Sequence, residues 1–266
     1  MSTLVKEVRF DQKEMEYLEF GNKDGEVFVI LPGLSLKSVM GSAVGIVNAY
    51  QLLAEEYHMY LFDHIKKEPE GYTADDMAKD TLCAMELLGL YDITLMGVSM
   101  GGMVSQLITL KDPKRIKRLI LCSTTSTMKY ADPDLFGRWR SLAEERNLPK
   151  LMEAFGEAVY TPSFYEQYKE IILASGNGTE EQNFNNFLIS LNAMKDFDVT
   201  ERLTEIKCPI LVLGAGEDRV LGVERSKEIM EKTGCAGYVY EGYGHGVYDE
   251  APDYLSRIKE FLDSVK

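Results

Sequence analysis

The sequence contains few histidines and cysteines, which limits the metal and redox chemistry it can support. Of its 266 residues three are histidine and four are cysteine, and there is no Cys-x-x-Cys pair. No histidine stands at a metal-ligand spacing from another histidine or from a cysteine, so we expect no metal site. Because no export signal is evident, we expect the cysteines to be reduced thiols rather than a disulfide framework.

Long apolar runs and an excess of positive charge are also missing. No stretch approaches the roughly 20 apolar residues that span a bilayer, and residues 1–15 lack the apolar segment of a signal peptide. The chain has 29 Lys and Arg against 43 Asp and Glu, a net charge of -14, which repels phosphate groups. We therefore expect a soluble, cytoplasmic protein that binds neither nucleic acid nor membranes.

What the sequence does contain is an alternation of apolar runs and helical patterns. At 45% hydrophobic and 27% charged residues the composition is that of an ordinary globular protein. Expected strands, each ending at a turn-forming residue, are residues 27–31, 59–62, 93–96, 119–122, 210–213 and 238–240. Helical patterns lie between them, one opening at a capping box formed by Thr73 and Asp76. This order favours an α/β fold with a mostly parallel sheet and helices on both faces.

The two ends of this pattern differ from its middle. Residues 5–10 and 14–20 alternate with period two and predict an antiparallel hairpin at the edge of the sheet. Between residues 125 and 204 the strand pattern stops and several helices are expected. We therefore predict a core domain of residues 1–124 and 205–266 that carries a helical cap insertion, residues 125–204.

The predicted cap is rich in aromatic residues. Residues 130–200 hold 11 of the 27 aromatic side chains, more than a surface layer of helices needs. Some would pack the cap onto the core, and others are expected to face a substrate cavity. The candidates for substrate binding are Phe136, Trp139, Phe155, Phe164, Phe184 and Phe187.

The most specific motif is Gly97-Val98-Ser99-Met100-Gly101, which fits Gly-x-Ser-x-Gly between an expected strand and an expected helix. A serine on such a tight turn has strained backbone geometry, and small residues two positions before and after it avoid clashes. The alternative is a plain glycine-rich turn with a capping serine. The strand-to-helix context favours Ser99 as a nucleophile.

A serine hydroxyl needs a base that removes its proton and an acid that orients the base. His245 is the expected base, because its glycine-flanked loop follows the last strand; His64, at the end of the strand 59–62, is the rival. Asp218 follows the strand 210–213 and precedes His245 in the chain, which makes it the expected acid. Glu217 is the competing acid. A structural role for His245 or a turn-capping role for Asp218 also stays open.

The remaining requirement is an oxyanion hole, two N–H donors where a carbonyl oxygen gains charge. The backbone N–H of Met100 at a helix N-terminus is one candidate, and that of Leu34, after Pro32 and Gly33, is the second. Residues 214–216 begin like a dinucleotide fingerprint but lack its third glycine. We therefore expect no nucleotide and no other cofactor.

These motifs together resemble the alpha/beta-hydrolase family, in which the triad follows the order of Ser99, Asp218 and His245. The likeness covers essentially the whole chain and is strongest to the capped, cofactor-free branch of esterases, enol-lactonases and carbon-carbon-bond hydrolases. One departure concerns Pro32-Gly33, where the family usually has His-Gly. A proline has neither an N–H nor an imidazole, so this loop lacks its usual side-chain anchor.

The resemblance implies a serine hydrolase that cleaves a small ester or lactone through an acyl-enzyme on Ser99. The alternatives are cleavage of a carbon-carbon bond, cofactor-free peroxide chemistry, or ligand binding with little turnover. The expected partner is a small molecule, and a homodimer is compatible with the sequence. Because residues 130–200 carry a net charge of -6, the substrate is expected to be largely apolar, although Arg138 or Arg140 would allow one carboxylate.

Overall fold

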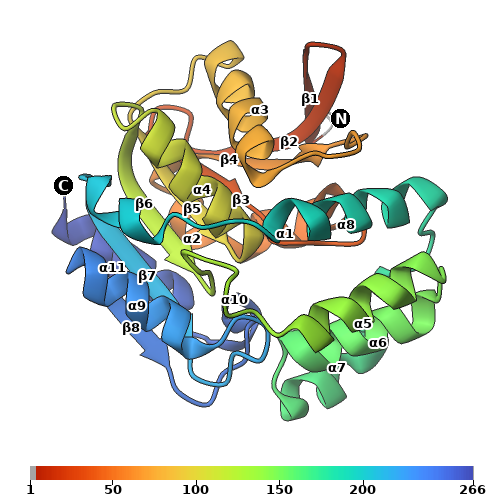
Figure 1. Ribbon diagram of the computed structural model, residues 1–266. Coiled ribbons are helices and arrows are strands. Elements are labelled where there is room, and N and C mark those ends of the chain that lie inside the picture. Colours follow the sequence, from red (N-terminus) through yellow and green to blue (C-terminus); the bar gives the residue numbers. More distant parts are fainter. Residues whose placement is uncertain (1–3, 266) are drawn as a thin grey trace.

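A single eight-stranded sheet forms the centre of the protein (Figure 1), in a computed structural model that describes residues 4–265. Its strand order is β1-β2-β4-β3-β5-β6-β7-β8. The strands are β1 (Val5–Phe10), β2 (Lys13–Gly21), β3 (Glu26–Leu31), β4 (Tyr57–Ile65), β5 (Ile93–Val98), β6 (Ile116–Cys122), β7 (Ile210–Ala215) and β8 (Ala236–Tyr240). The pairs β1–β2 and β2–β4 are antiparallel and all other neighbours are parallel. The mostly parallel sheet and the antiparallel edge hairpin are thus confirmed.

Helices connect the strands and also form the segment between β6 and β7. They are α1 (Ala43–Ala49), α2 (Gln51–Ala54), α3 (Ala74–Leu87), α4 (Met100–Lys111), α5 (Pro133–Glu144), α6 (Leu148–Val159), α7 (Pro162–Ser175), α8 (Glu181–Met194), α9 (Val223–Thr233), α10 (Val247–Glu250) and α11 (Tyr254–Ser264), with short 3-10 turns at Val39–Ser42 and Thr200–Glu205. None of the helices described is both long and apolar enough to cross a membrane. Residues 1–3, part of the segment expected to lack a signal peptide, lie outside the described residues.

Both faces of the central strands are buried over most of their length, which explains the continuous apolar runs at residues 27–31 of β3 and 119–122 of β6. In β3, Val29 packs into the cluster that contains residues of α3 and α4, whereas Phe28 and Ile30 pack into the cluster that contains residues of α2 and α11. Each of the three is at most 2% exposed. Alternate side chains of one strand therefore pack against helices on opposite faces of the sheet, as the sequence predicts. The four cysteines are free thiols, as expected.

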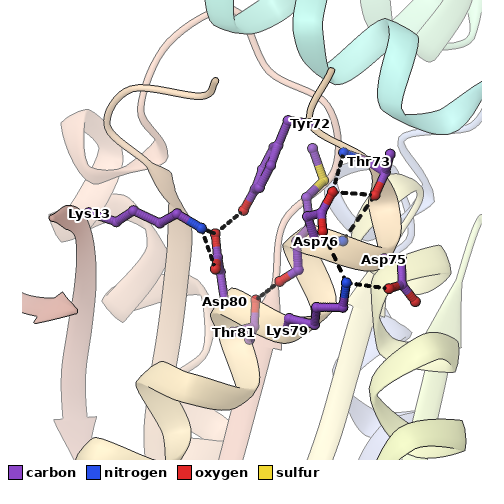
Figure 2. Close-up of polar contacts among 9 residues, drawn as sticks. Lys13, Tyr72, Thr73, Asp75, Asp76, Lys79, Asp80 and Thr81 are labelled. Carbon is purple, nitrogen blue, oxygen red and sulfur yellow. Dashed lines mark hydrogen bonds and ion pairs between the residues drawn. The ribbon is translucent and has the colours of Figure 1, made fainter. Parts of the chain in front are cut away.

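Two sets of polar contacts hold the first half of helix α3: a capping box at its N-terminus and a group around Asp80 (Figure 2). The predicted capping box is present, since Thr73 Oγ1 accepts from the Asp76 amide and the Asp76 carboxylate accepts from the Thr73 amide, both at 3.2 Å. One turn later the buried Asp80 accepts hydrogen bonds from Lys13 Nζ at 2.7 Å and from the Tyr72 hydroxyl at 2.5 Å. Because Lys13 belongs to β2, this group joins α3 to the edge hairpin.

The two ends of the segment between β6 and β7 lie side by side. Thr127 pairs with Asp198 in an isolated antiparallel bridge, and the Met128 amide donates to the Phe197 carbonyl oxygen at 2.9 Å. Helices α5 to α8 lie between these ends; Figure 1 draws α5 to α7 in green as one group, and α8 in teal apart from them. We refer to these four helices and their connections as the cap. The domain boundaries at residues 125 and 204 stay a prediction.

One contact between the cap and the core involves a buried carboxyl group. Glu68, in the loop after β4, is 4% exposed. The Ser190 hydroxyl of α8 lies 2.9 Å from both of its carboxylate oxygens, and the Glu68 amide donates to Asn186 Oδ1 of the same helix at 3.2 Å. Burial raises the pKa of Glu68 to about 7.

This raised pKa predicts a pH-dependent stability. An unfolded glutamate loses its proton near pH 4.3, about the ordinary value, whereas folded Glu68 keeps it up to about pH 7. Ionisation is harder in the folded state than in the unfolded state. The free energy of unfolding contributed by this group is therefore lost as the pH rises from about 4.3 to about 7, and it is not regained at higher pH. Glu68→Gln cannot ionise, and its advantage over the wild type should grow by about 2.5 kcal/mol between pH 5 and pH 8.

Urea unfolding of the wild type and Glu68→Gln at both pH values measures this difference. Glu70→Gln is the matched control, because Glu70 is two residues away and exposed. A difference between wild type and Glu68→Gln that is the same at both pH values would show that Glu68 ionises as an ordinary glutamate.

Candidate active site

Ser99 lies at the turn between β5 and α4 with φ 52° and ψ -117°. This is a backbone region that residues with a side chain rarely adopt. The two glycines of the motif are required by close approach: a Cβ at Gly101 would lie 2.3 Å from the Leu31 carbonyl oxygen, and a Cβ at Gly97 would lie 2.3 Å from the Gly101 carbonyl oxygen. The pattern Gly-x-Ser-x-Gly therefore lets the turn pack against β3.

The structure brings the three predicted triad residues together. His245 Nε2 lies 2.9 Å from Ser99 Oγ, and His245 Nδ1 lies 2.8 Å from Asp218 Oδ2. The side chains of His245 and Asp218 are 5% and 3% exposed. The three residues follow β5, β7 and β8, whose carboxyl ends lie at the same edge of the parallel part of the sheet.

Neither rival residue takes part in this arrangement. Glu217 is exposed, and its backbone amide donates to the Tyr243 carbonyl oxygen at 2.9 Å. His64 lies in β4 and lines a different cavity, which Glu68 and Ser190 also line. Asp218 and His245, rather than Glu217 and His64, are thus the residues placed next to Ser99.

The environment of Asp218 keeps its carboxyl group ionised. Its Oδ1 accepts hydrogen bonds from the amides of Val220 at 2.8 Å and Leu221 at 2.9 Å. Burial acts to raise the pKa of Asp218, but the facing His245 and the two amides outweigh it and hold the pKa below the ordinary value. An ionised Asp218 favours a proton on His245 Nδ1, which leaves Nε2 free to accept the Ser99 proton.

The two residues proposed as oxyanion donors border Ser99. Met100 is the first residue of α4, and the amides of the first helical turn have no acceptor within the helix. Leu34 lines the cavity that contains Ser99. The loop is packed on the elbow although it lacks the usual histidine, since a Cβ at Gly101 would lie 2.5 Å from the Pro32 carbonyl oxygen. The donor roles of Leu34 and Met100 stay a prediction.

Ser99 opens into a small cavity of about 40 Å³ that is lined mainly by apolar residues. Its lining residues are Gly33, Leu34, Ser99, Met103, Phe136, Trp139, Phe155, Val159, Met194, Val220, Leu221, His245 and Tyr248. This set includes no Asp, Glu, Lys or Arg, and Arg138 and Arg140 are not part of it. Among the residues that the structure describes, no three His, Cys, Asp or Glu side chains are arranged to hold a metal ion.

A family model for the alpha/beta hydrolase fold matches residues 26–252. The chain belongs to the alpha/beta hydrolase family. Among curated relatives, 3-oxoadipate enol-lactonase 2 of Acinetobacter baylyi is 23% identical over 223 residues, covering 82% of this chain and 80% of the relative. The putative carbamate hydrolase RutD of Agrobacterium fabrum is 25% identical over 266 residues, covering 93% and 98%. Both names describe hydrolases.

Solved alpha/beta hydrolases share the whole fold. MGS-M2, an alpha/beta hydrolase from a Medee basin deep-sea metagenome library, superposes with a TM-score of 0.85 at 19% identity, covering 97% of each chain. The enol-lactonase of Burkholderia xenovorans LB400 superposes with a TM-score of 0.80 at 18% identity, covering 97% of this chain and 100% of the other. At these identities the likeness shows the fold alone.

The six aromatic residues predicted to bind substrate divide into two groups in this hydrolase. Phe136, Trp139 and Phe155 line the cavity beside Ser99, and the Trp139 ring packs at 5.3 Å from the ring of Phe136 and 4.7 Å from that of Phe155. These three come from α5 and α6. The other three are placed elsewhere.

Phe164, Phe184 and Phe187 do not line this cavity, although Phe187 lines a neighbouring cavity together with Phe155, and their part in substrate binding stays a prediction. Phe164 is on α7 and packs against Tyr160 and Tyr168. Phe184 lies under the Arg146 guanidinium, and Phe187 packs edge-on behind Phe155. Aromatic composition predicts an aromatic cavity wall, but it does not distinguish residues that line the wall from those that support it.

A larger cavity of about 470 Å³ adjoins the one beside Ser99. Gly33, Leu34 and Tyr248 line both cavities. A volume of 40 Å³ holds a few water molecules, whereas ligand sites commonly measure about 300 to 1,000 Å³. A substrate larger than a few atoms would therefore extend from Ser99 into the adjoining cavity or displace the cap.

Sequence reasoning missed several residues of the site. Val220 and Leu221 hold Asp218 through their amides and line the cavity with their side chains. Tyr248 is three residues after His245 and lies between the two cavities. Val220 and Leu221 lie close in the chain to the predicted acid, and Tyr248 lies close to the predicted base. This closeness is the sequence feature that could have indicated them. Val159 has no such signal, because it comes from the end of α6.

Proposed function

We propose that this protein is a serine hydrolase that cleaves a small, largely apolar carboxylic ester or lactone. Ser99 Oγ attacks the carbonyl carbon while His245 Nε2 accepts its proton, and the ionised Asp218 stabilises the imidazolium. The imidazolium then gives the proton to the departing alkoxide, which leaves an acyl-enzyme on Ser99. Water, deprotonated by His245, attacks the acyl group and releases the acid. The observation that carries the proposal is the hydrogen-bonded chain from Asp218 through His245 to Ser99.

The negative charge formed during both attacks needs stabilisation by fixed donors. The amides of Met100 and Leu34 fill this role in our proposal, because Met100 opens α4 and Leu34 borders the same cavity. No charged side chain is needed for this step, since backbone amides in a site closed to water act strongly on a developing charge.

The cavity lining supports the choice of an apolar substrate. Apart from the triad residues Ser99 and His245, only Trp139 and Tyr248 among the lining residues carry a polar side-chain group, and the Trp139 indole N–H is itself buried. The hydrocarbon part of an ester or lactone would contact Phe136 and Phe155. A multiply charged substrate finds no compensating cation there.

We expect kcat/KM for neutral esters to rise as the acyl group grows from two towards six carbons. Each methylene accommodated should contribute about 0.8 kcal/mol, or about fourfold. Anionic esters of matched length should be poorer substrates, because the lining would leave their charge unpaired. Steady-state kinetics on both series measure this. Equal rates for all lengths, or a preference for multiply charged esters, would contradict the apolar substrate class while leaving the serine mechanism intact.

A further inference from the structure

The loop that carries His245 is bonded to a segment of the cap. Residues 159–161, which we call the strap, connect α6 to α7. The Gly246 amide donates to the Val159 carbonyl oxygen at 2.8 Å. A Cβ at Gly244 would lie 2.8 Å from the same oxygen and 2.9 Å from the Thr161 nitrogen. The glycines beside His245 therefore make room for the strap, and the loop is held rather than free.

Glu250, at the end of α10, joins the two segments through one carboxylate. Its Oε1 accepts from the Thr161 amide at 3.1 Å and from the Gly244 amide at 3.3 Å. Its Oε2 accepts from the Thr161 hydroxyl at 2.5 Å. One side chain thus bonds the residue directly before His245 and the cap residue that faces it, and Thr161 is 6% exposed.

Two further contacts hold the strap on the same edge of the site. The Tyr160 hydroxyl donates to Asp249 Oδ2 at 2.8 Å, and Arg219 Nη2 donates to the Tyr160 carbonyl oxygen at 2.6 Å. Arg219 directly follows Asp218, so the strap touches both the loop of the acid and the loop of the base. Val159 also lines the cavity beside Ser99.

We propose that Glu250 is a positioning residue that couples the position of the strap, and with it the cap, to the placement of His245. This inference rests on the proposed serine mechanism. When the strap is hydrogen-bonded to Glu250, the same carboxylate also holds the Gly244 amide, and His245 stays within hydrogen-bonding reach of Ser99 and Asp218. When the strap moves, the carboxylate loses Thr161 and the loop loses its support. Reaction is thereby restricted to the conformation in which the cap covers the substrate.

Glu250→Ala removes all three hydrogen bonds and should lower kcat about 10- to 100-fold, the range expected for a misplaced catalytic group. KM should change little, because Glu250 does not line the cavity. The rate at which a small fluorophosphonate labels Ser99 should fall by the same factor, and the loss should be equal for short and long esters. Glu250→Gln keeps an acceptor oxygen and should restore most of the rate.

Asp253→Ala is the matched control, since Asp253 is a nearby carboxylate that pairs with Arg257 at 2.9 Å and bonds neither the strap nor the loop in the contacts described. It should keep the wild-type kcat and labelling rate. If Glu250→Ala does not fold, Thr161→Val carries the same test, because it removes only the hydroxyl bond; it should lower kcat several-fold at unchanged KM.

A kcat within twofold of the wild type in Glu250→Ala, or a change confined to KM or to chain-length preference, would overturn the positioning role. Equal losses in Glu250→Ala and Glu250→Gln would overturn it as well, because the acceptor oxygen would then not matter. These outcomes are distinct from failure of the proposed function, in which Ser99 of the wild-type protein would not be labelled at all.

Discussion

Replacing Ser99 by alanine is expected to abolish both ester hydrolysis and fluorophosphonate labelling. The Ser99 hydroxyl is the group that His245 Nε2 contacts at 2.9 Å, and without it no acyl-enzyme forms. Loss of a triad nucleophile costs on the order of 10⁶ in kcat. The fold should survive, because alanine fits the space of serine and the Ser99 backbone bonds, such as its amide to the Cys122 carbonyl oxygen at 2.9 Å, do not involve the hydroxyl.

Intact mass after labelling, followed by peptide mapping, measures this directly and needs no knowledge of the substrate. Ser123 offers a matched control: it follows the neighbouring strand β6, has a positive φ of 43°, and is fully buried. Ser123→Ala should be labelled like the wild type. Undiminished labelling of Ser99→Ala would show that another residue is the nucleophile.

The catalytic elbow is predictable from sequence because it depends on local backbone packing. Gly97 and Gly101 stand where a Cβ would collide with carbonyl oxygens, and such a requirement leaves a fixed spacing in the chain. The strands are predictable for a similar reason, since burial of both faces makes β3 apolar from Val27 to Leu31 and leaves Thr94 as the one polar side chain of β5. Asp218 follows from chain order and from its place after β7.

Contacts between segments that are distant in the chain leave no fixed residue spacing in the sequence. Glu250 bonds Thr161 across 89 positions of the chain, through an amide that every non-proline residue has. Phe164 and Phe155 look alike in composition, but only tertiary packing decides that Phe155 lines the cavity and that Phe164 packs between two tyrosines. The raised pKa of Glu68 likewise comes from burial against α8, which no local pattern records.

Asp218→Asn should lower turnover on the order of 10⁴-fold while leaving the fold intact, as for other triads of this kind. The amide can keep the two bonds that Asp218 Oδ1 accepts from Val220 and Leu221, so the loop keeps its shape. Its NH2 group would then face His245 Nδ1 and donate to it, which places the imidazole proton on Nε2. In that tautomer Nε2 cannot accept the Ser99 proton, and the imidazolium formed in the reaction loses its negative partner.

Single-turnover acylation with a chromogenic ester measures this loss without interference from product release. Glu217→Gln is the matched control, because Glu217 is the adjacent acid and its side chain is exposed; its acylation rate should stay within a few-fold of the wild type. If Glu217→Gln were the more damaging change, the acid would have to be Glu217, and the 2.8 Å contact between Asp218 and His245 would not be the arrangement used in the reaction. If both changes were mild, His245 would act without an orienting carboxylate.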